Sequence, residues 1–282
     1  MSYVPKNIIA VPTGQFATMA AAATYANATA TVASPLVILG MPGTETQPCA
    51  ITNDAVRVAY LTQQAREPLF AQDFMGAGPP SGVFAITQSR ADATLYGIVT
   101  TYGPGVYHIS TDAVNPAERI YLDTSVKLWA NVAYGLIYET RFLIKAALPP
   151  TAGNLMVIGL TSDYNADPAN WTKCAYVRVN GNDGGRVYCR TDDNTAHNTG
   201  ELDSGVVVVA DTWYTLQIDC TTAASVKFYL DGTRLLAATV FDMSDAAGVH
   251  WMEPIFFLNE SAATEGPMDL YIDYVKAWQS RQ

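Results

Sequence analysis

The sequence predicts an all-β fold, a two-sheet antiparallel jelly-roll sandwich with an N-terminal extension. From Leu69 onward, short runs of β-branched and aromatic residues alternate with polar ones and are separated by clusters of Gly, Pro, Asn and Asp. These runs recur roughly every 8 to 15 residues, and no long helical pattern lies between them. Such spacing is typical of two antiparallel sheets packed face to face rather than of a parallel α/β sheet.

The composition supports a folded, acidic protein. Of the 282 residues, 49% are hydrophobic and only 15% are charged, so the chain has ample material for a core. The 16 Lys and Arg stand against 26 Asp and Glu, giving a formal net charge of -10. Because a nucleic-acid-binding protein must neutralise phosphates, we expect no nucleic acid partner. No apolar run reaches the length of about 18 residues that a membrane span needs, and the first residues lack a secretion-signal pattern, so we expect no membrane partner.

The chain is predicted to consist of an N-terminal arm, residues 1–68, and a sandwich, residues 69–282. Residues 1–44 are rich in Ala and Thr and carry one charged side chain, Lys6, whereas the acidic residues begin at Glu45. A neutral segment of this kind favours packing on another surface over free solvation, so we interpret it as a docking segment. Its secondary structure stays open between helix and extended chain.

Two hairpins are predicted in the sandwich. Residues 226–230 alternate between apolar and polar positions, and Asp231-Gly232 then supplies the positive φ angles of a tight turn. A second hairpin pairs residues 174–179 with residues 186–190 across a loop rich in Asn and Gly. Two further strands are each expected to have one dry face, formed by Leu216, Ile218 and Cys220 in one and by Leu270, Ile272 and Tyr274 in the other.

These segments, in this order, resemble a known family over residues 70–278. The residues that carry the resemblance are Asp73-Phe74, Tyr102-Gly-Pro-Gly-Val-Tyr-His-Ile-Ser110, Asp211-Thr-Trp213, Val226 to Gly232 and Leu270 to Trp278. The chain is similar to the concanavalin A-like, or laminin G-like, jelly-roll domain found in virion structural proteins of tailed bacteriophages. Residues 1–68 lie outside the resemblance, so it implies nothing about the arm.

The resemblance implies a virion protein that is assembled in the bacterial host cytoplasm and binds other virion proteins. A capsid decoration or cement protein is the preferred version, followed by a head or tail appendage. The alternative is a carbohydrate-binding module of a phage adsorption device, such as a tail fibre or receptor-binding protein, with a host-surface glycan as partner. We expect a homo-oligomer, and a trimer by analogy with decoration proteins rather than from any repeat in the sequence.

No complete catalytic motif is present, so we predict that the chain is not an enzyme and name no catalytic residue. Glycanases of this fold carry a Glu-x-Asp-x-x-Glu signature, and the nearest match, Glu201-Leu-Asp203, has Val206 in place of the second Glu. The segment is predicted to be an acidic loop that follows a turn-rich stretch. A Ser nucleophile elbow is absent because Gly78-Pro-Pro-Ser-Gly82 is out of register.

No metal or other cofactor is predicted. Calcium is not favoured, although the acidic segment from Asp192 to Asp203 offers oxygen ligands, because position 6 of the loop is His197 rather than Gly. For a glycan, Trp171 with its neighbour Asn170 is the candidate contact, because the surrounding residues are predicted to form a loop. Plain packing of Trp171 is nevertheless favoured over this contact. The cysteines are expected to be buried thiols.

Overall fold

The computed structural model describes residues 70–72, 74, 84–88, 96–99, 102, 105–111, 119–124, 130–145, 154–162, 167–195, 197–244, 251–260 and 267–279. The chain divides into two units after Pro68, and every described residue follows that point. The predicted arm, residues 1–68, with its open alternatives, therefore lies outside the described residues.

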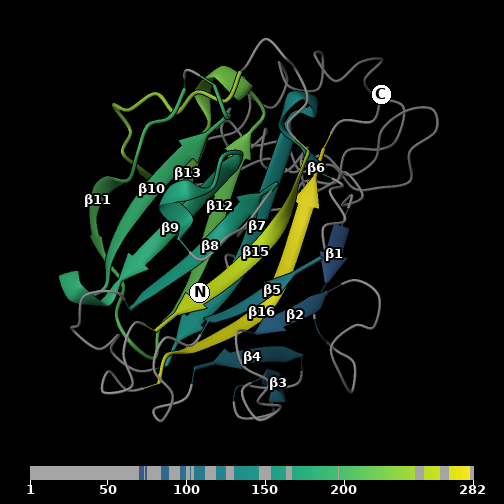
Figure 1. The fold of residues 1–282 in the computed structure, drawn as a ribbon, viewed down its shortest axis with the longest axis vertical. Coiled ribbons are helices and arrows are strands. Elements are labelled where there is room, and N and C mark those ends of the chain that lie inside the picture. Colours follow the sequence, from purple (N-terminus) through teal and green to yellow (C-terminus); the bar gives the residue numbers. More distant parts are fainter. Residues whose placement is uncertain are drawn as a thin grey trace, which may run out of the picture. The chain divides into compact units, whose positions relative to one another are not determined.

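The described residues form two eight-stranded antiparallel sheets, which confirms the predicted sandwich (Figure 1). We name the first one the β7 sheet. Its strands are in the order β14-β13-β12-β7-β16-β4-β3, and β1 pairs with β16. These strands are β14 (Thr233–Leu235), β13 (Lys227–Leu230), β12 (Trp213–Cys220), β7 (Leu136–Ile144), β16 (Asp269–Trp278), β4 (Val106–Ser110), β3 (Tyr96–Val99) and β1 (Phe70–Gln72).

The second sheet, the β8 sheet, has the order β11-β10-β9-β8-β15-β5-β2, and β6 pairs with β15. Its strands are β11 (Leu202–Val207), β10 (Arg186–Asp192), β9 (Cys174–Asn180), β8 (Leu155–Thr161), β15 (Trp251–Asn259), β5 (Arg119–Asp123), β2 (Ala85–Gln88) and β6 (Ala130–Asn131). The helices in the described ranges are short 3-10 turns: η1 (Val132–Tyr134), η2 (Pro168–Asn170), η3 (Gly181–Asp183) and η4 (Ala223–Ser225). None of the described helices is long and apolar enough to cross a bilayer.

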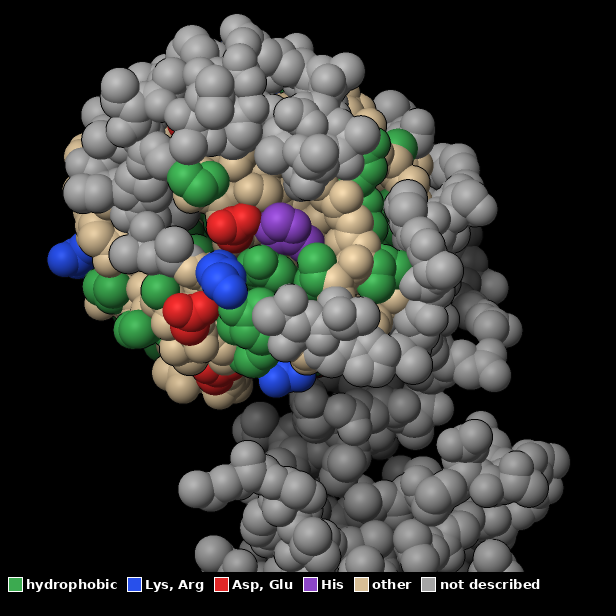
Figure 2. All heavy atoms as spheres, turned by 90° about the horizontal axis from the view of Figure 1, so that it is seen from below, with side chains coloured by type: hydrophobic (Ala, Val, Ile, Leu, Met, Phe, Trp, Pro, Cys, Tyr) green, Lys and Arg blue, Asp and Glu red, His purple; other side chains and the backbone are tan. Residues whose placement is uncertain are grey.

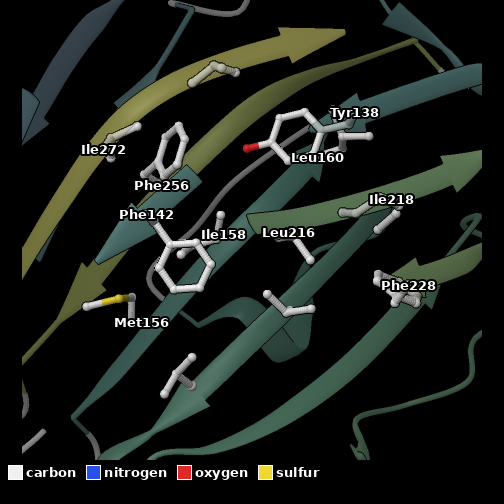
Figure 3. Packing of buried hydrophobic residues seen from close by; sticks show 14 of the residues in the cluster. Tyr138, Phe142, Met156, Ile158, Leu160, Leu216, Ile218, Phe228, Phe256 and Ile272 are labelled. Carbon is white, nitrogen blue, oxygen red and sulfur yellow. The ribbon is translucent and has the colours of Figure 1, made fainter. Parts of the chain in front are cut away.

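The core lies between the two sheets, where each strand contributes every second side chain (Figure 3). Tyr138 and Phe142 of β7 face Ile158 of β8 and Phe256 of β15, and all four are at most 1% exposed. Removing apolar surface from water contributes roughly 25 cal/mol per Å², so this layer dominates the stability of the fold. It also decides which side chains are left on the outer faces.

Both predicted hairpins are confirmed. Strands β13 and β14 are joined by Asp231 and Gly232, whose φ angles of 49° and 76° are those of a tight two-residue turn. Strands β9 and β10 pair along their whole length, from Cys174 with Asp192 to Asn180 with Arg186. The dry face predicted for Leu216, Ile218 and Cys220 is confirmed as well, since all three side chains are fully buried.

The predicted dry face of the last strand is wrong at one position. Leu270 and Ile272 are buried, but a register shift between Ile272 and Tyr274 interrupts the alternation of β16. A bulge of this kind adds one residue to a strand and so reverses the side-chain phase beyond it. Val275 and Ala277 therefore enter the core, whereas Tyr274 is only half-buried.

The described cysteines, Cys174, Cys189 and Cys220, are buried free thiols, as expected. Cys174 packs with Trp171 and Phe257 on the outer side of the β8 sheet, whereas Cys189 belongs to the core between the sheets. A disulfide needs side chains that point toward each other, so their places on opposite faces exclude a bond between Cys174 and Cys189.

The backbones of β8 and β9 approach each other closely at Gly159, which generates a prediction. A methyl group there would lie 2.4 Å from the carbonyl oxygen of Ala175 and 2.6 Å from the Cα atom of Tyr176. Gly159→Ala should therefore push β8 and β9 apart and lower the free energy of unfolding by about 1–3 kcal/mol, measured as a lower urea midpoint. Ala224→Ser, at an exposed position of η4, is the control. A Gly159→Ala protein with the parent midpoint would contradict this contact.

Candidate functional site

The predicted glycan contact, Trp171, lies beneath a short loop on the outer face of the β8 sheet. Its indole is 0% exposed, with ring centroids 5.5 Å from Tyr176 and 5.7 Å from Phe257. Asp167 caps the turn η2 that precedes it by accepting a hydrogen bond from the backbone N–H of Ala169 at 2.9 Å. A buried indole offers no face to a sugar ring, so the structure assigns Trp171 the packing role.

Arg190 holds the loop that carries Trp171 in place through hydrogen bonds to its backbone. This guanidinium is 3% exposed and donates from Nη1 to the carbonyl oxygen of Pro168 at 2.6 Å and from Nη2 to that of Trp171 at 3.3 Å. Asp192 balances the charge at 2.9 Å. We therefore correct the glycan-contact assignment of Trp171. Asn170 is exposed and donates to Asp167 at 3.2 Å, and its glycan contact stays a prediction.

The acidic segment that the sequence offers for calcium or catalysis is engaged with nearby basic side chains. Glu201 pairs with Arg178 at 2.6 Å and Asp203 pairs with Arg186 at 2.9 Å, so these carboxylates act as counter-ions of the β9–β10 hairpin. Asp203 lies inside strand β11, which corrects the prediction of a loop. Within the described ranges, no group of three or more His, Cys, Asp or Glu is placed to hold a metal ion.

A cluster of aromatic rings lies on the outer face of the β7 sheet. We name it the aromatic surface and define it by Tyr102, His108, Trp213 and Tyr271. The ring of Tyr102 meets Tyr271 edge-on at 4.8 Å and Trp213 at 6.0 Å, and His108 stacks on Tyr271 at 4.6 Å. Tyr102, His108 and Trp213 are half-exposed, whereas Tyr271 is 8% exposed and supports them from below.

The strand order brings these rings together. Tyr271 lies on β16, which pairs on one side with β4, where it is opposite His108, and on the other side with β7. Trp213 begins β12, the next strand after β7, and is opposite Leu143. Figure 2 shows histidine, acidic and basic side chains gathered beside hydrophobic ones on the face seen from below.

Two carboxylates and a lysine border the Tyr102 side of the aromatic surface. Asp269 binds Nε2 of His108 at 2.7 Å, and Asp211 accepts a hydrogen bond from the Tyr102 hydroxyl at 3.3 Å. The Lys145 ammonium lies 5.3 Å from the centroid of the Tyr102 ring, and this residue is half-buried. A hydroxyl group can donate a hydrogen bond to either carboxylate and accept one from the Lys145 ammonium.

The Trp213 side is bordered by an ion pair. The Arg141 guanidinium lies 4.7 Å from the centroid of the Trp213 ring, a distance typical of a cation–π contact. The same guanidinium binds Asp273 at 2.7 Å through Nη1. Both groups are partly exposed, so the pair orients the indole rather than supplying much stability.

The charges of the aromatic surface influence one another. Burial raises the pKa of the Asp269 carboxyl, but hydrogen bonds from His108 and Ser110 lower it more, and the net shift is downward. A hydrogen bond with Tyr102 raises the pKa of the Lys145 ammonium. Asp269 is therefore a carboxylate and Lys145 a cation at neutral pH, as hydrogen-bonding to a polar ligand requires.

Sequence reasoning did not find this surface. The alternation of Asp269 and Tyr271 with Leu270 and Ile272 already places the first two on an outer face, which was the available signal. Trp213 entered the sequence analysis only as part of the family resemblance. Its approach to Tyr102 depends on strand order between segments that lie far apart in the sequence, and no local pattern gives that order.

Comparison with protein families shows which family the chain belongs to. Residues 104–273 match the family model described as the C-terminal domain of SO2946-like proteins. The chain belongs to the SO2946-like family. No curated protein matches the sequence of this SO2946-like chain.

Solved structures similar to the SO2946-like domain share its jelly-roll fold at low sequence identity. The laminarinase of Rhodothermus marinus has a TM-score of 0.54 at 15% identity, over 77% of this chain and 98% of its own. A structure described with endo-acting O-glycanases of the human gut microbiota has a TM-score of 0.53 at 10% identity, over 76% and 100%. The carbohydrate recognition domain of Emp47p has a TM-score of 0.50 at 10% identity, over 75% and 96%. These comparisons establish the fold.

The prediction that the chain is not an enzyme is wrong, because glycoside hydrolases share its fold. Glycoside hydrolases, including a laminarinase and an endo-1,3-β-glucanase, share the jelly-roll architecture over three quarters of the SO2946-like chain. The incomplete motif at Val206 therefore does not separate this chain from enzymes. The jelly-roll fold is the coarser conclusion that holds.

The lowered pKa of Asp269 generates a prediction about acid stability. A carboxyl whose pKa is lower in the folded than in the unfolded state stabilises the fold above the unfolded value, about 3.9, and loses that contribution as the pH falls through the folded pKa. Asp269→Asn should therefore lower the urea midpoint more at about pH 6 than at about pH 3, where the parent carboxyl is being protonated. An equal loss at both pH values would show that the charge of Asp269 does not stabilise the fold.

Proposed function

We propose that this SO2946-like domain binds glycans through the aromatic surface of the β7 sheet. The observation that carries the proposal is the half-exposed ring pair of Tyr102 and Trp213 beside the polar groups Lys145, Asp211 and Asp269. An aromatic ring packs on the apolar face of a pyranose, and flanking carboxylates and amines hydrogen-bond with the hydroxyls. This corresponds to the carbohydrate-binding alternative of the sequence analysis, at a different place in the fold.

We place the site on the β7 sheet because two partly exposed rings, Tyr102 and Trp213, meet there, whereas the ring cluster around Trp171 on the β8 sheet is buried. On the β8 sheet, the rings of Trp171, Tyr176 and Phe257 are all fully buried, so they have no surface left for a ligand. On the β7 sheet, Tyr102 and Trp213 keep part of their surface. Contact area with a sugar ring is therefore available on the aromatic surface.

Removing a ring tests the proposal. A buried aromatic side chain contributes roughly 1.5–3 kcal/mol, so Trp213→Ala or Tyr102→Ala should weaken binding of a glycan-array hit by about 10- to 100-fold in titration calorimetry. Tyr188→Ala removes a half-buried ring from β10 on the other sheet and is the matched control. An array without any hit, or parent affinity in both ring variants, would exclude this site.

We also propose that the chain is a component of a tailed-phage virion. Support comes from the similarity of residues 102–110 and the following strand segments to phage jelly-roll domains, and from the near absence of charge in residues 1–44. In an adsorption device, the arm anchors the domain and the aromatic surface binds a host glycan. In the second version, a capsid decoration or cement protein, the arm docks on the shell.

Deleting residues 1–44 tests the virion proposal. An apolar arm docks by burying surface rather than by charge, so the parent protein should stay on particles at high salt and the deletion should abolish incorporation. The measurement is the amount of protein on purified particles. Full-length Trp213→Ala, whose arm is intact, should be incorporated like the parent. Unchanged incorporation of the deletion protein would contradict the docking role of the arm.

A further inference from the structure

We infer that the aromatic surface selects uncharged saccharides over anionic ones. The inference rests on the proposed glycan-binding function and concerns the chemical class of the ligand. It follows from the charges that surround the rings on the outer face of the β7 sheet.

Acidic side chains outnumber permanent cations in the neighbourhood of the rings. Around the rings and along the adjoining outer positions of β7 and β16, the described acids are Glu139, Asp211, Asp269 and Asp273, and the described permanent cations are Arg141, Lys145 and Lys276. The formal net charge of the whole chain, which includes these groups, is -10. An anionic ligand would therefore approach a negative surface, which slows association and weakens binding at low salt.

The strongest anion-binding group on this face is already engaged. Arg141 binds Asp273 at 2.7 Å and lies over the Trp213 ring at 4.7 Å. A guanidinium recognises a carboxylate or sulfate best when two parallel N–H groups are available, and Asp273 competes for them. Lys276 lies 4.2 Å from the centroid of Tyr274, on the bulged half of β16. Arg141 is therefore already paired with one anion, and Lys276 lies against the ring of Tyr274.

The remaining cation, Lys145, lies over the ring of Tyr102 at 5.3 Å, and the hydroxyl of that ring binds Asp211 at 3.3 Å. Besides the hydrogen bond with Tyr102, the negative charge of Asp211 raises the pKa of the Lys145 ammonium. The positive charge of Lys145 is in turn among the influences that lower the pKa of the Asp269 carboxyl. A uronate or sulfate bound to Lys145 would therefore lie close to two like charges, and such contacts are unfavourable. A neutral sugar avoids this cost. Its hydroxyls donate to the carboxylates and accept from the ammonium, and hydrogen bonds to charged groups are stronger than neutral ones.

The experiment compares neutral polysaccharides with their anionic derivatives. The probes are laminarin and dextran, each with a carboxymethylated and a sulfated form of matched length, measured by affinity electrophoresis at about 20 and about 150 mM salt. Because screening shortens the reach of charges to about 8 Å at the higher salt, the neutral form of a bound polymer should bind at least about fivefold more tightly at low salt, with a smaller ratio at high salt.

Variants connect this selectivity to the proposed residues. Asp211→Asn removes an exposed carboxylate, and Asp269→Asn removes the partner of His108; each should reduce the neutral-to-anionic ratio at low salt. Asp219→Asn, on β12 beside Lys227, is the control for loss of one negative charge away from the rings and should leave the ratio at the parent value.

The outcomes separate this inference from the function on which it rests. Equal or tighter binding of the anionic forms at low salt, with binding still lost in Trp213→Ala, would overturn the selectivity and support glycan binding. No binding to any of the probes or to a glycan array would overturn the proposed function. An Asp211→Asn protein with the parent ratio would overturn the role assigned to that carboxylate.

Discussion

The apolar contact between the inner faces of the two sheets is the constraint on which the rest of the structure depends. Because strand side chains alternate, burying Leu270 and Ile272 between the sheets leaves Asp269 and Tyr271 no place but the outer face. The aromatic surface is in this sense a by-product of the core. Its polar groups are placed with the rigidity of a sheet rather than that of a loop.

The two outer faces of the sandwich differ in how their aromatic rings are covered. On the β8 sheet, a short loop lies over the aromatic rings, and Arg190 holds its carbonyl oxygens so that the backbone polar groups beneath it are satisfied. On the β7 sheet, the rings support one another and keep part of their area in contact with solvent. The ring cluster around Trp171 is therefore closed to a ligand, whereas the rings of the aromatic surface can be reached by one.

The sequence predicted what local patterns determine. The turn at Asp231-Gly232 and the alternation in residues 216–220 were found because both are encoded within a few neighbouring residues. Tyr274 was misplaced because a bulge leaves no distinct mark in an alternating pattern. Trp171 was kept as a candidate glycan contact because its neighbours suit a loop, but it is fully buried and packs, which was the favoured alternative. The pairing of Tyr102 with Trp213 required the order of strands, which is a long-range property.

The placement of the cysteines has a consequence for the conditions that the domain can withstand. Cys174 and Cys189 are separated by the thickness of a sheet, and burial raises the pKa of the Cys189 thiol to about 12, so the reactive thiolate is suppressed. Burial raises the pKa of Cys220 as well. The described sandwich therefore needs no oxidation to mature and has no cross-link to lose. Burial therefore protects Cys189 and Cys220 from oxidation.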